Sequence, residues 1–304
     1  MSSDGMGSDG LTGRHIWIDG RLEPADDTHL SAFDRGFQLG DGIFETLRAT
    51  AGHATELDEH LARLRASAAG LEIELPDSLE QDVARGIAAL LAVDDLAGVD
   101  GDASVRITVS RGVVAARGLL PAADSRATIV IQAWPVTPPP AAQLERGVHL
   151  IASSMRRDPA SPLAALKTTS RADFVYARLE ARRAGADDAL FLTIDGDLSE
   201  ATSANIFLVR GSELATPSLD CAILAGTTRT WILRWAADAG LAVAETHLTA
   251  AELAGADEAF LCSSVAGIIP VTRFAGAAIG TGHPGPWTIR ARAAREAFIR
   301  AGNG

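Results

Sequence analysis

Two residues of this 304-residue chain, Lys167 and Glu200, have side chains suited to one kind of chemistry. Lys167 lies in SPLAALKTTSRADF, just ahead of a helical pattern, and Glu200 follows 33 positions later in DGDLSEATSANIFLV. A neutral lysine amine forms a Schiff base with an aldehyde, and a carboxylate can keep a ring nitrogen protonated. Pyridoxal phosphate chemistry needs both groups, so the pair is a candidate for that chemistry.

The surroundings of Lys167 favour a neutral amine. The residues before it, Leu163, Ala164, Ala165 and Leu166, offer an apolar setting, and such a setting favours the uncharged form of a lysine. Lysine is also scarce here, since nearly all of the 27 basic residues are arginine. A lone lysine at a helix start is otherwise most simply a solvated charge, so the prediction depends on the wider pattern.

Helices and strands must position these groups. HIWIDGRLEP predicts a hairpin that turns at Asp19-Gly20, and LDEHLARLRASAAGL predicts an amphipathic helix that closes at Gly70. The segments ASVRITVSRG and ATIVIQAWPV are rich in Val, Ile and Thr and predict strands. The elements expected further along are a helix from about 171 to 185, a hairpin over 189–209, a helix opening at 227–228, a strand over 258–263 and a C-terminal helix in TIRARAAREAFIRAG.

Three consecutive prolines, Pro138 to Pro140, mark the expected domain boundary, because proline disfavours a helix and favours an extended connector. We expect a small N-terminal α/β domain over 1–133, of which 1–13 form a mobile tail. A proline-rich linker over 134–143 then leads to a large cofactor-binding domain over 144–304. In such a mixed α/β chain of two domains, the interdomain cleft is the natural ligand site.

Composition excludes several classes of function. The net charge of −12 argues against a nucleic-acid partner and against an anionic membrane surface. No run of about 18 apolar residues is present, so no membrane span is expected. Cys221 and Cys262 have no metal-like spacing and no secretory segment precedes them, so we expect a cytoplasmic enzyme without a bound metal.

The stretch from Lys167 through Glu200, LKTTSRADFVYARLEARRAGADDALFLTIDGDLSEATSANIFLV, resembles the class-IV (fold-type IV) pyridoxal phosphate aminotransferases. That family includes branched-chain aminotransferase, D-amino acid transaminase and aminodeoxychorismate lyase. The resemblance extends from about Trp17 to Phe298. It implies two α/β domains with pyridoxal 5'-phosphate in the interdomain cleft, and a homodimer with the active site near the subunit interface.

The resemblance also implies roles for particular residues. Lys167 is the catalytic lysine, and Glu200 with Asn205 matches the family's acid and the asparagine five positions later. A helix N-terminus binds anions, and the family's phosphate loop is matched by LAGTTR. The residues expected to hold the phosphate are Gly226, Thr227, Thr228, Arg63 and Ser264. The residues expected on the substrate side are Phe44, Thr46 and Arg48 from the N-terminal motif, Arg117 as the leading carboxylate ligand, and Arg35 and Arg171 nearby.

The sequence motifs that distinguish one activity of the family from another are less specific than the cofactor motifs. Branched-chain enzymes have Phe-Glu-Gly in the N-terminal motif and a tyrosine soon after the lysine, whereas this chain has Phe44-Glu45-Thr46 and no such tyrosine. We therefore expect an aminotransferase that moves an amino group between an amino acid, most simply D-configured, and a 2-oxo acid by a ping-pong mechanism. FETLR and SVAGIIPV also resemble aminodeoxychorismate lyase, which releases pyruvate and 4-aminobenzoate. An L-branched-chain enzyme and a catalytically silent relative are further alternatives.

Overall fold

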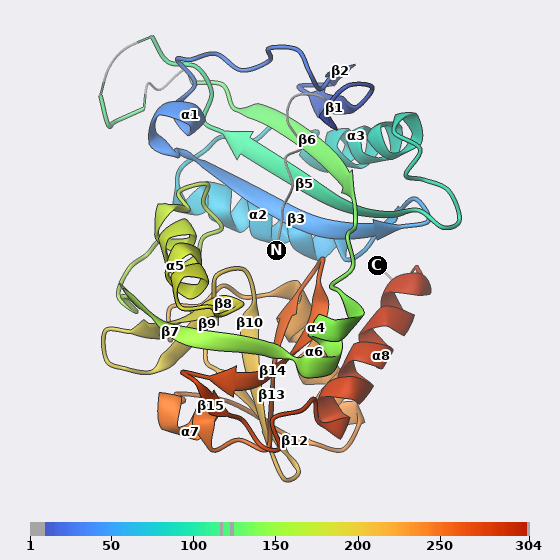
Figure 1. Cartoon of the computed structure of the whole chain (residues 1–304). Helices are drawn as coiled ribbons and strands as arrows, with labels where there is room; N and C mark the ends of the chain where they lie inside the picture. The colour runs from blue at the N-terminus through green and yellow to red at the C-terminus, as the bar shows by residue number, and fades with distance from the viewer. Residues whose placement is uncertain (1–9, 116–117, 122–124, 303–304) are drawn as a thin grey trace. The chain divides into compact units, whose positions relative to one another are not determined.

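The computed structural model describes residues 10–115, 118–121 and 125–302 (Figure 1). The chain divides into two compact units. The first consists of residues 1–136, 167–170 and 302–304, and the second of 137–166 and 171–301. Each unit is built on its own β-sheet with its own helices, which confirms the mixed α/β class expected from the sequence.

The first unit contains a six-stranded antiparallel sheet in the order β2-β1-β6-β5-β3-β4. Its strands are β1 (His15–Ile18), β2 (Arg21–Pro24), β3 (Gly42–Thr50), β4 (His53–Ala54), β5 (Asp102–Ser110) and β6 (Thr128–Pro135). Its helices are α1 (Arg35–Leu39), α2 (Leu57–Gly70) and α3 (Leu79–Val93). The β1–β2 hairpin was predicted correctly, and both turn residues, Asp19 and Gly20, have positive φ as such a turn requires.

Alternation along the central strands separates two faces of this sheet. On β5, Ala103, Val105, Ile107 and Val109 are fully buried and pack with α2 and α3 in one core. Residues between them, such as Arg106, lie on the opposite, half-buried face, because successive side chains of a strand alternate. The sheet therefore has one apolar face under the helices and one face free to carry polar chemistry.

Helices α2 and α3 cover the apolar face. The predicted helix α2 begins at Leu57 and ends at Gly70, and buries Leu61 and Leu64 in the core. Helix α3 was not predicted, although Leu79, Val83, Ile87 and Leu90 follow helical spacing and are all buried. Helix α2 packs against β3, whereas α3 packs against β1 and β6.

The second unit contains a nine-stranded mixed sheet in the order β12-β11-β10-β13-β14-β7-β8-β9, with β15 paired to β14. Its strands are β7 (Val148–Arg157), β8 (Asp188–Thr193), β9 (Leu198–Ala201), β10 (Asn205–Arg210), β11 (Glu213–Pro217), β12 (Ala242–Thr246), β13 (Glu258–Ser263), β14 (Gly267–Phe274) and β15 (Ala277–Ala278). Its helices are α4 (Ala141–Arg146), α5 (Ala172–Arg183), α6 (Thr227–Asp238), α7 (Ala250–Ala254) and α8 (Pro286–Arg300).

Helices cover this larger sheet on both faces. Helices α6 and α8 pack over the stacked rings of Phe207 and Phe260, whose centroids are 5.2 Å apart. Leu253 of α7 packs with Leu208 and Leu261 on the other face. The predicted helices and the strand over 258–263 are confirmed, whereas the hairpin expected over 189–209 consists of three strands, because Thr202 to Ala204 break the second strand. Along the described part of the chain, no helix has the length and apolar character needed to cross a membrane.

Candidate active site

Lys167 belongs to a four-residue segment, 167–170, that runs beside β3 in the first unit. The Phe44 N–H donates to the Lys167 carbonyl at 2.9 Å, and the Lys167 N–H donates to the Ser67 hydroxyl at 3.1 Å. The Thr169 N–H donates to the Gly42 carbonyl at 2.9 Å. These bonds fix the backbone on both sides of the lysine, so its side chain starts from a rigid position.

The ring of Phe44 lies close to two cations. The Lys167 Nζ is 4.8 Å from the ring centroid, and the Arg106 Cζ is 3.9 Å from it. Both distances are within the range of a cation–π interaction. Leu163, expected to shield the lysine, is 53% exposed, so the aromatic contact comes instead from Phe44.

Arg106 was not predicted as a site residue. It stands directly opposite Thr46 in the β3–β5 register, and its Nε donates to the Thr108 hydroxyl at 3.1 Å. Burial lowers the pKa of Arg106, and within the described residues it forms no ion pair. The sequence signal that could have revealed it is a charged residue in the middle of an alternating strand, on the face opposite the core. A partly desolvated guanidinium of this kind is suited to binding an anion.

Arg63, the predicted phosphate ligand, is held by a buried carboxylate. Its Nε and Nη2 each donate to Glu45 at 2.7 Å, and His60 Nδ1 lies 2.7 Å from the same group. The Arg63 side chain is only 12% exposed, so it is not a solvated charge on the helix surface. Glu45 thus fixes the orientation of the guanidinium.

This cluster predicts an acid-sensitive contribution to stability. Burial alone would raise the pKa of Glu45, but the hydrogen bonds and charges of Arg63 and His60 lower it to about 2. Because the folded value lies below the ordinary value of 4.5, the stabilisation is complete above pH 4.5 and is lost as the pH falls through about 2.

We expect Glu45→Gln to lower the free energy of unfolding at pH 7 by about 3 kcal/mol, as removal of one partner from a buried ion pair does. The difference from wild type should shrink as the pH falls from 4.5 towards 2. Urea unfolding at a series of pH values measures both the loss of unfolding free energy at pH 7 and its change with pH. A difference between variant and wild type that stays constant from pH 4.5 to 2 would contradict the stabilising role of the charged Glu45.

The other predicted arginines have varied surroundings. Arg35 is buried, forms an ion pair with Asp41 at 2.7 Å and donates to two backbone carbonyls, so it is a structural residue of the N-terminal motif. Arg48 forms a two-point ion pair with Asp102 at 2.7 and 2.6 Å. Arg171 donates to the Thr202 carbonyl and stacks on a neighbouring ring. Arg35, expected on the substrate side, has its guanidinium engaged by these three acceptors. Arg117 lies outside the described residues.

Glu200 lies in β9 of the second unit and is buried. Its Oε2 accepts the Leu224 N–H at 3.1 Å, and its Oε1 lies 3.5 Å from Arg157 Nη2. Arg157 also donates to the Ala222 carbonyl and lies 4.9 Å from the Phe174 ring centroid, so its guanidinium is held in place. The donors around Glu200 suit an anionic carboxylate.

The predicted phosphate loop opens helix α6 in the same unit. Gly226 is the N-cap, and Thr227 Oγ1 lies 3.3 Å from Ser264 Oγ. A Cβ at Gly226 would lie 2.2 Å from Asn205 Oδ1, so only glycine fits beside that amide. Asn205 in turn donates to the Leu224 carbonyl at 3.0 Å. Asn205 therefore fixes the loop, while the two hydroxyls and the helix N-terminus offer donors to an anion.

Thr228 faces away from this group of hydroxyls. It is buried, and its hydroxyl accepts from Arg295 at 3.3 Å. Its backbone N–H remains part of the first turn of α6, where the helix dipole favours negative charge. Thr228 can thus contribute to phosphate binding through its backbone.

Each unit carries groups of the kinds that pyridoxal phosphate needs. In the first, Lys167 is the only lysine of the 304 residues and is a primary amine of the kind that reacts with an aldehyde. In the second, Glu200 is a carboxylate of the kind that suits a ring nitrogen, and the start of α6 with Thr227 and Ser264 offers donors of the kind that suit a phosphate. Arg63 adds a fixed cation.

Comparison with known proteins agrees with this chemistry. The family model of amino-transferase class IV matches residues 42–274. A Methanocaldococcus jannaschii protein provisionally named branched-chain-amino-acid aminotransferase is 36% identical over 276 residues, covering 90% of this chain and 92% of its own. Aminodeoxychorismate lyase of Bacillus subtilis is 33% identical, covering 85% and 86%. D-alanine aminotransferase of Bacillus licheniformis is 31% identical, covering 93% and 96%.

A solved structure shares the fold along almost the whole chain. The branched-chain amino acid aminotransferase of Escherichia coli superposes with a TM-score of 0.87 at 26% identity, covering 95% of both chains. The family model covers well over half of the sequence, and three relatives exceed 30% identity over most of it. The chain therefore belongs to the class IV amino-transferase family and is a pyridoxal phosphate-dependent enzyme.

Proposed function

We propose that the protein is a transaminase that moves an amino group between a D-amino acid and a 2-oxo acid by a ping-pong mechanism. The observation that carries the proposal is the pair of cations at the Phe44 ring, where Lys167 Nζ and Arg106 Cζ lie 4.8 and 3.9 Å from one centroid. An amine for covalent chemistry thus stands near a guanidinium that can bind a carboxylate, and amino acids and 2-oxo acids both carry one.

Each proposed residue has a defined task. Lys167 Nζ would hold the cofactor aldehyde and would also be the group that takes the proton from the substrate Cα. Glu200 would keep a proton on the ring nitrogen. Bound pyridoxal phosphate supplies an electron-withdrawing ring that stabilises the negative charge left on Cα. Arg63 in the first unit and the start of α6 in the second each offer donors suited to a phosphate.

The residues beside Arg106 disfavour a branched-chain substrate, whereas the configuration of the substrate is decided by the spectral test described below. Branched-chain enzymes have glycine where this chain has Thr46, and Thr46 is the direct strand partner of Arg106. Its side chain fills space on the sheet face that carries Phe44, which disfavours a large aliphatic group there. More of the relatives are named branched-chain aminotransferase than D-alanine aminotransferase or lyase, so the proposal rests on the residues of this chain and not on those names.

The second candidate is aminodeoxychorismate lyase. It is supported by the 33% identical relative of that name and by the FETLR and SVAGIIPV segments, which resemble that branch. A lyase would share the tasks of Lys167 and Glu200 up to removal of the Cα proton. A lyase would then release pyruvate, whereas a transaminase would release the 2-oxo acid that corresponds to its amino acid substrate.

The test is the absorption spectrum of the holoenzyme with D-alanine, and separately with L-alanine, in the absence of any 2-oxo acid. Conversion to the pyridoxamine spectrum by the D-isomer alone supports the proposal. Conversion by the L-isomer alone would overturn it in favour of an L-specific transaminase. If neither isomer converts the cofactor, aminodeoxychorismate becomes the substrate to try, and release of pyruvate would establish the lyase.

Arg106 gives a prediction about substrate affinity. We expect Arg106→Gln to raise KM for the amino acid and the 2-oxo acid by about 10- to 100-fold with a smaller change in kcat, because a charge-assisted hydrogen bond to a carboxylate contributes about 1.5–3 kcal/mol. Arg21→Gln, at an exposed position of β2, is the matched control. An unchanged KM for both substrates would mean that another residue binds the substrate carboxylate.

We also propose a cytoplasmic homodimer. Phe33, Phe37 and Leu39 of the N-terminal motif are 60%, 77% and 44% exposed, and apolar groups of this size are commonly covered by a partner. Cys221 and Cys262 are both free thiols, which suits a reducing compartment. Light scattering on the eluting protein tests the dimer, and a mass of about one chain would contradict it.

A further inference from the structure

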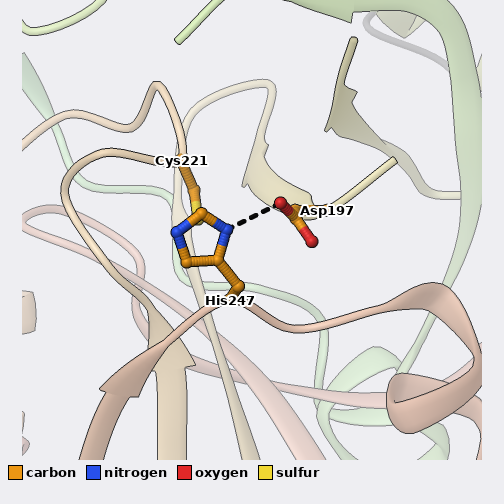
Figure 2. A group of neighbouring side chains, drawn as sticks. All are labelled: Asp197, Cys221 and His247. Carbon is orange, nitrogen blue, oxygen red and sulfur yellow. Dashed lines mark hydrogen bonds and ion pairs between the residues drawn. The ribbon is translucent and has the colours of Figure 1, made fainter. Parts of the chain in front are cut away.

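A second group of reactive side chains lies apart from the residues assigned above, in the second unit (Figure 2). Asp197 lies in the turn between β8 and β9, Cys221 in the segment after β11, and His247 just after β12. One ligand atom from each residue lies within 4.8 Å of the others. The three come from segments 24 and 26 positions apart, so no sequence motif marks them (221 − 197 and 247 − 221).

We propose that Asp197, Cys221 and His247 form a binding site for a zinc ion. Thiolate, imidazole and carboxylate are the three ligand types that zinc takes from proteins, and this mixture is less suited to magnesium or calcium. At ordinary zinc–ligand distances, tetrahedral ligand atoms lie about 3.3–3.8 Å apart. A closing movement of about 1 Å therefore brings the group to coordination distance.

The histidine is already oriented for this role. Asp197 Oδ2 lies 2.7 Å from His247 Nδ1, and Asp220 Oδ2 lies 3.2 Å from His247 Nε2. Histidines that bind metals usually donate the second ring N–H to a carboxylate, which fixes the tautomer and the ring. With the ion on Nδ1, beside Asp197 and Cys221, Asp220 takes that supporting position.

The site has a buried side and an open side. Cys221 is fully buried, whereas the side chain of His247 is 56% exposed and that of Asp220 is 69% exposed. An ion can therefore enter from solvent and meet the sulfur at the bottom. Three protein ligands leave a fourth tetrahedral position for water or a small external ligand.

The backbone segment that follows Cys221 makes a hydrogen bond to Glu200, the carboxylate proposed for the cofactor ring nitrogen. The Ala222 carbonyl accepts from Arg157 Nη2 at 3.1 Å, and the Leu224 N–H donates to Glu200 at 3.1 Å. Ala222 has φ +56°, a left-handed conformation that a non-glycine residue keeps only when its surroundings hold it. Zinc on Cys221 would therefore hold this turn and the Leu224 N–H that donates to Glu200. An effect of zinc on catalysis through Glu200 rests on the proposed function, whereas zinc binding itself does not.

The test is zinc and cobalt binding by the tag-free holoenzyme. We expect one zinc per chain by calorimetry and a rise in thermal midpoint on zinc addition. Cobalt should give the visible bands of a tetrahedral site and a sulfur charge-transfer band, read as a difference spectrum so that the cofactor absorption cancels.

Variants and controls make the assignment specific. Asp220→Asn removes the partner that supports the histidine ring, and we expect it to weaken zinc binding by roughly 10- to 100-fold. His247→Gln removes a ligand itself, so we expect a larger loss of zinc affinity than for Asp220→Asn. The side chain of His247 is exposed, so the variant should fold. Cys221→Ser should lose the sulfur band, whereas Cys262→Ser and His283→Gln, which change a thiol and an imidazole elsewhere, should bind as wild type.

The outcomes separate this proposal from the catalytic one. Absence of zinc binding by the wild type, or equal binding by wild type and His247→Gln, overturns the metal site whatever the enzyme's substrate. Cobalt binding without a sulfur band would also overturn it, because Cys221 would then not be a ligand. Zinc binding does not depend on turnover, so it can succeed even if the D-alanine test fails.

Discussion

Replacement of Lys167 by alanine is expected to lower transamination by about 10⁴-fold or more, the largest effect of any single substitution in this chain. Proton transfer by a positioned side chain alone contributes about 10²- to 10⁴-fold, and Lys167 is also the proposed covalent holder of the cofactor. Its backbone is fixed by bonds to Phe44 and Ser67, so the alanine variant should keep the local fold. Formation of 2-oxo acid from the amino acid, followed with an excess of variant enzyme, measures the loss.

The lysine content of the chain allows a second, direct measurement. Because Lys167 is the only lysine, borohydride reduction of the holoenzyme should attach one cofactor per chain, and peptide mass mapping should find it on the peptide that contains Lys167. The Lys167→Ala variant should remain unlabelled apart from any reaction at the N-terminal amine. Full labelling of that variant, or activity within tenfold of wild type, would exclude Lys167 as the covalent residue.

The parts of the fold that were predictable are those set by local pattern. The β1–β2 hairpin follows from alternation and from Asp19-Gly20, and α2 follows from leucines at helical spacing. The three-strand arrangement over 188–210 was not predicted, although Thr202, Ser203 and Asn205 form a short polar cluster of the kind that separates two strands. Helix α3 carries Leu79, Val83, Ile87 and Leu90 at equally regular spacing, so its pattern was also sufficient to predict a helix.

The parts of the site that were not predictable depend on contacts between distant segments. The motif that contains Lys167 was evident, but only the structure shows that residues 167–170 pair with the start of β3. Arg106 lies 61 positions before the lysine (167 − 106), and its approach to Phe44 follows from the β3–β5 register, which a single sequence does not reveal.

Arginine roles were especially hard to assign from type alone. Arg35, Arg48 and Arg106 all lie in strand or motif segments of the first unit, yet the first two are held by Asp41 and Asp102. Which arginine keeps its guanidinium for a ligand depends on whether a carboxylate reaches it in the fold, as Asp41 reaches Arg35 and Asp102 reaches Arg48. That is a property of packing and register, and no local sequence rule decides it.

Substitution of Glu200 by glutamine is expected to lower kcat by about 10²- to 10³-fold, the range seen when one preorganised electrostatic group is removed from an active site. The amide has the same shape and can still accept the Leu224 N–H, but it carries no negative charge to keep the ring nitrogen protonated. KM should change little, because the substrate does not contact this side chain in the proposed scheme. Steady-state kinetics with the amino acid that converts the cofactor measures both constants.

Two controls guard this interpretation against a purely structural effect. Glu200→Gln leaves the charge of Arg157, 3.5 Å from Glu200, without its carboxylate, so thermal unfolding of the variant must first show a folded protein. Glu200→Asp keeps the charge on a shorter side chain and should recover part of the lost kcat, which a structural role would not predict. A glutamine variant with kcat within a few-fold of wild type and a normal cofactor spectrum would assign the ring nitrogen to another residue. The charge of Glu200, more than its shape, is therefore what the reaction is expected to need.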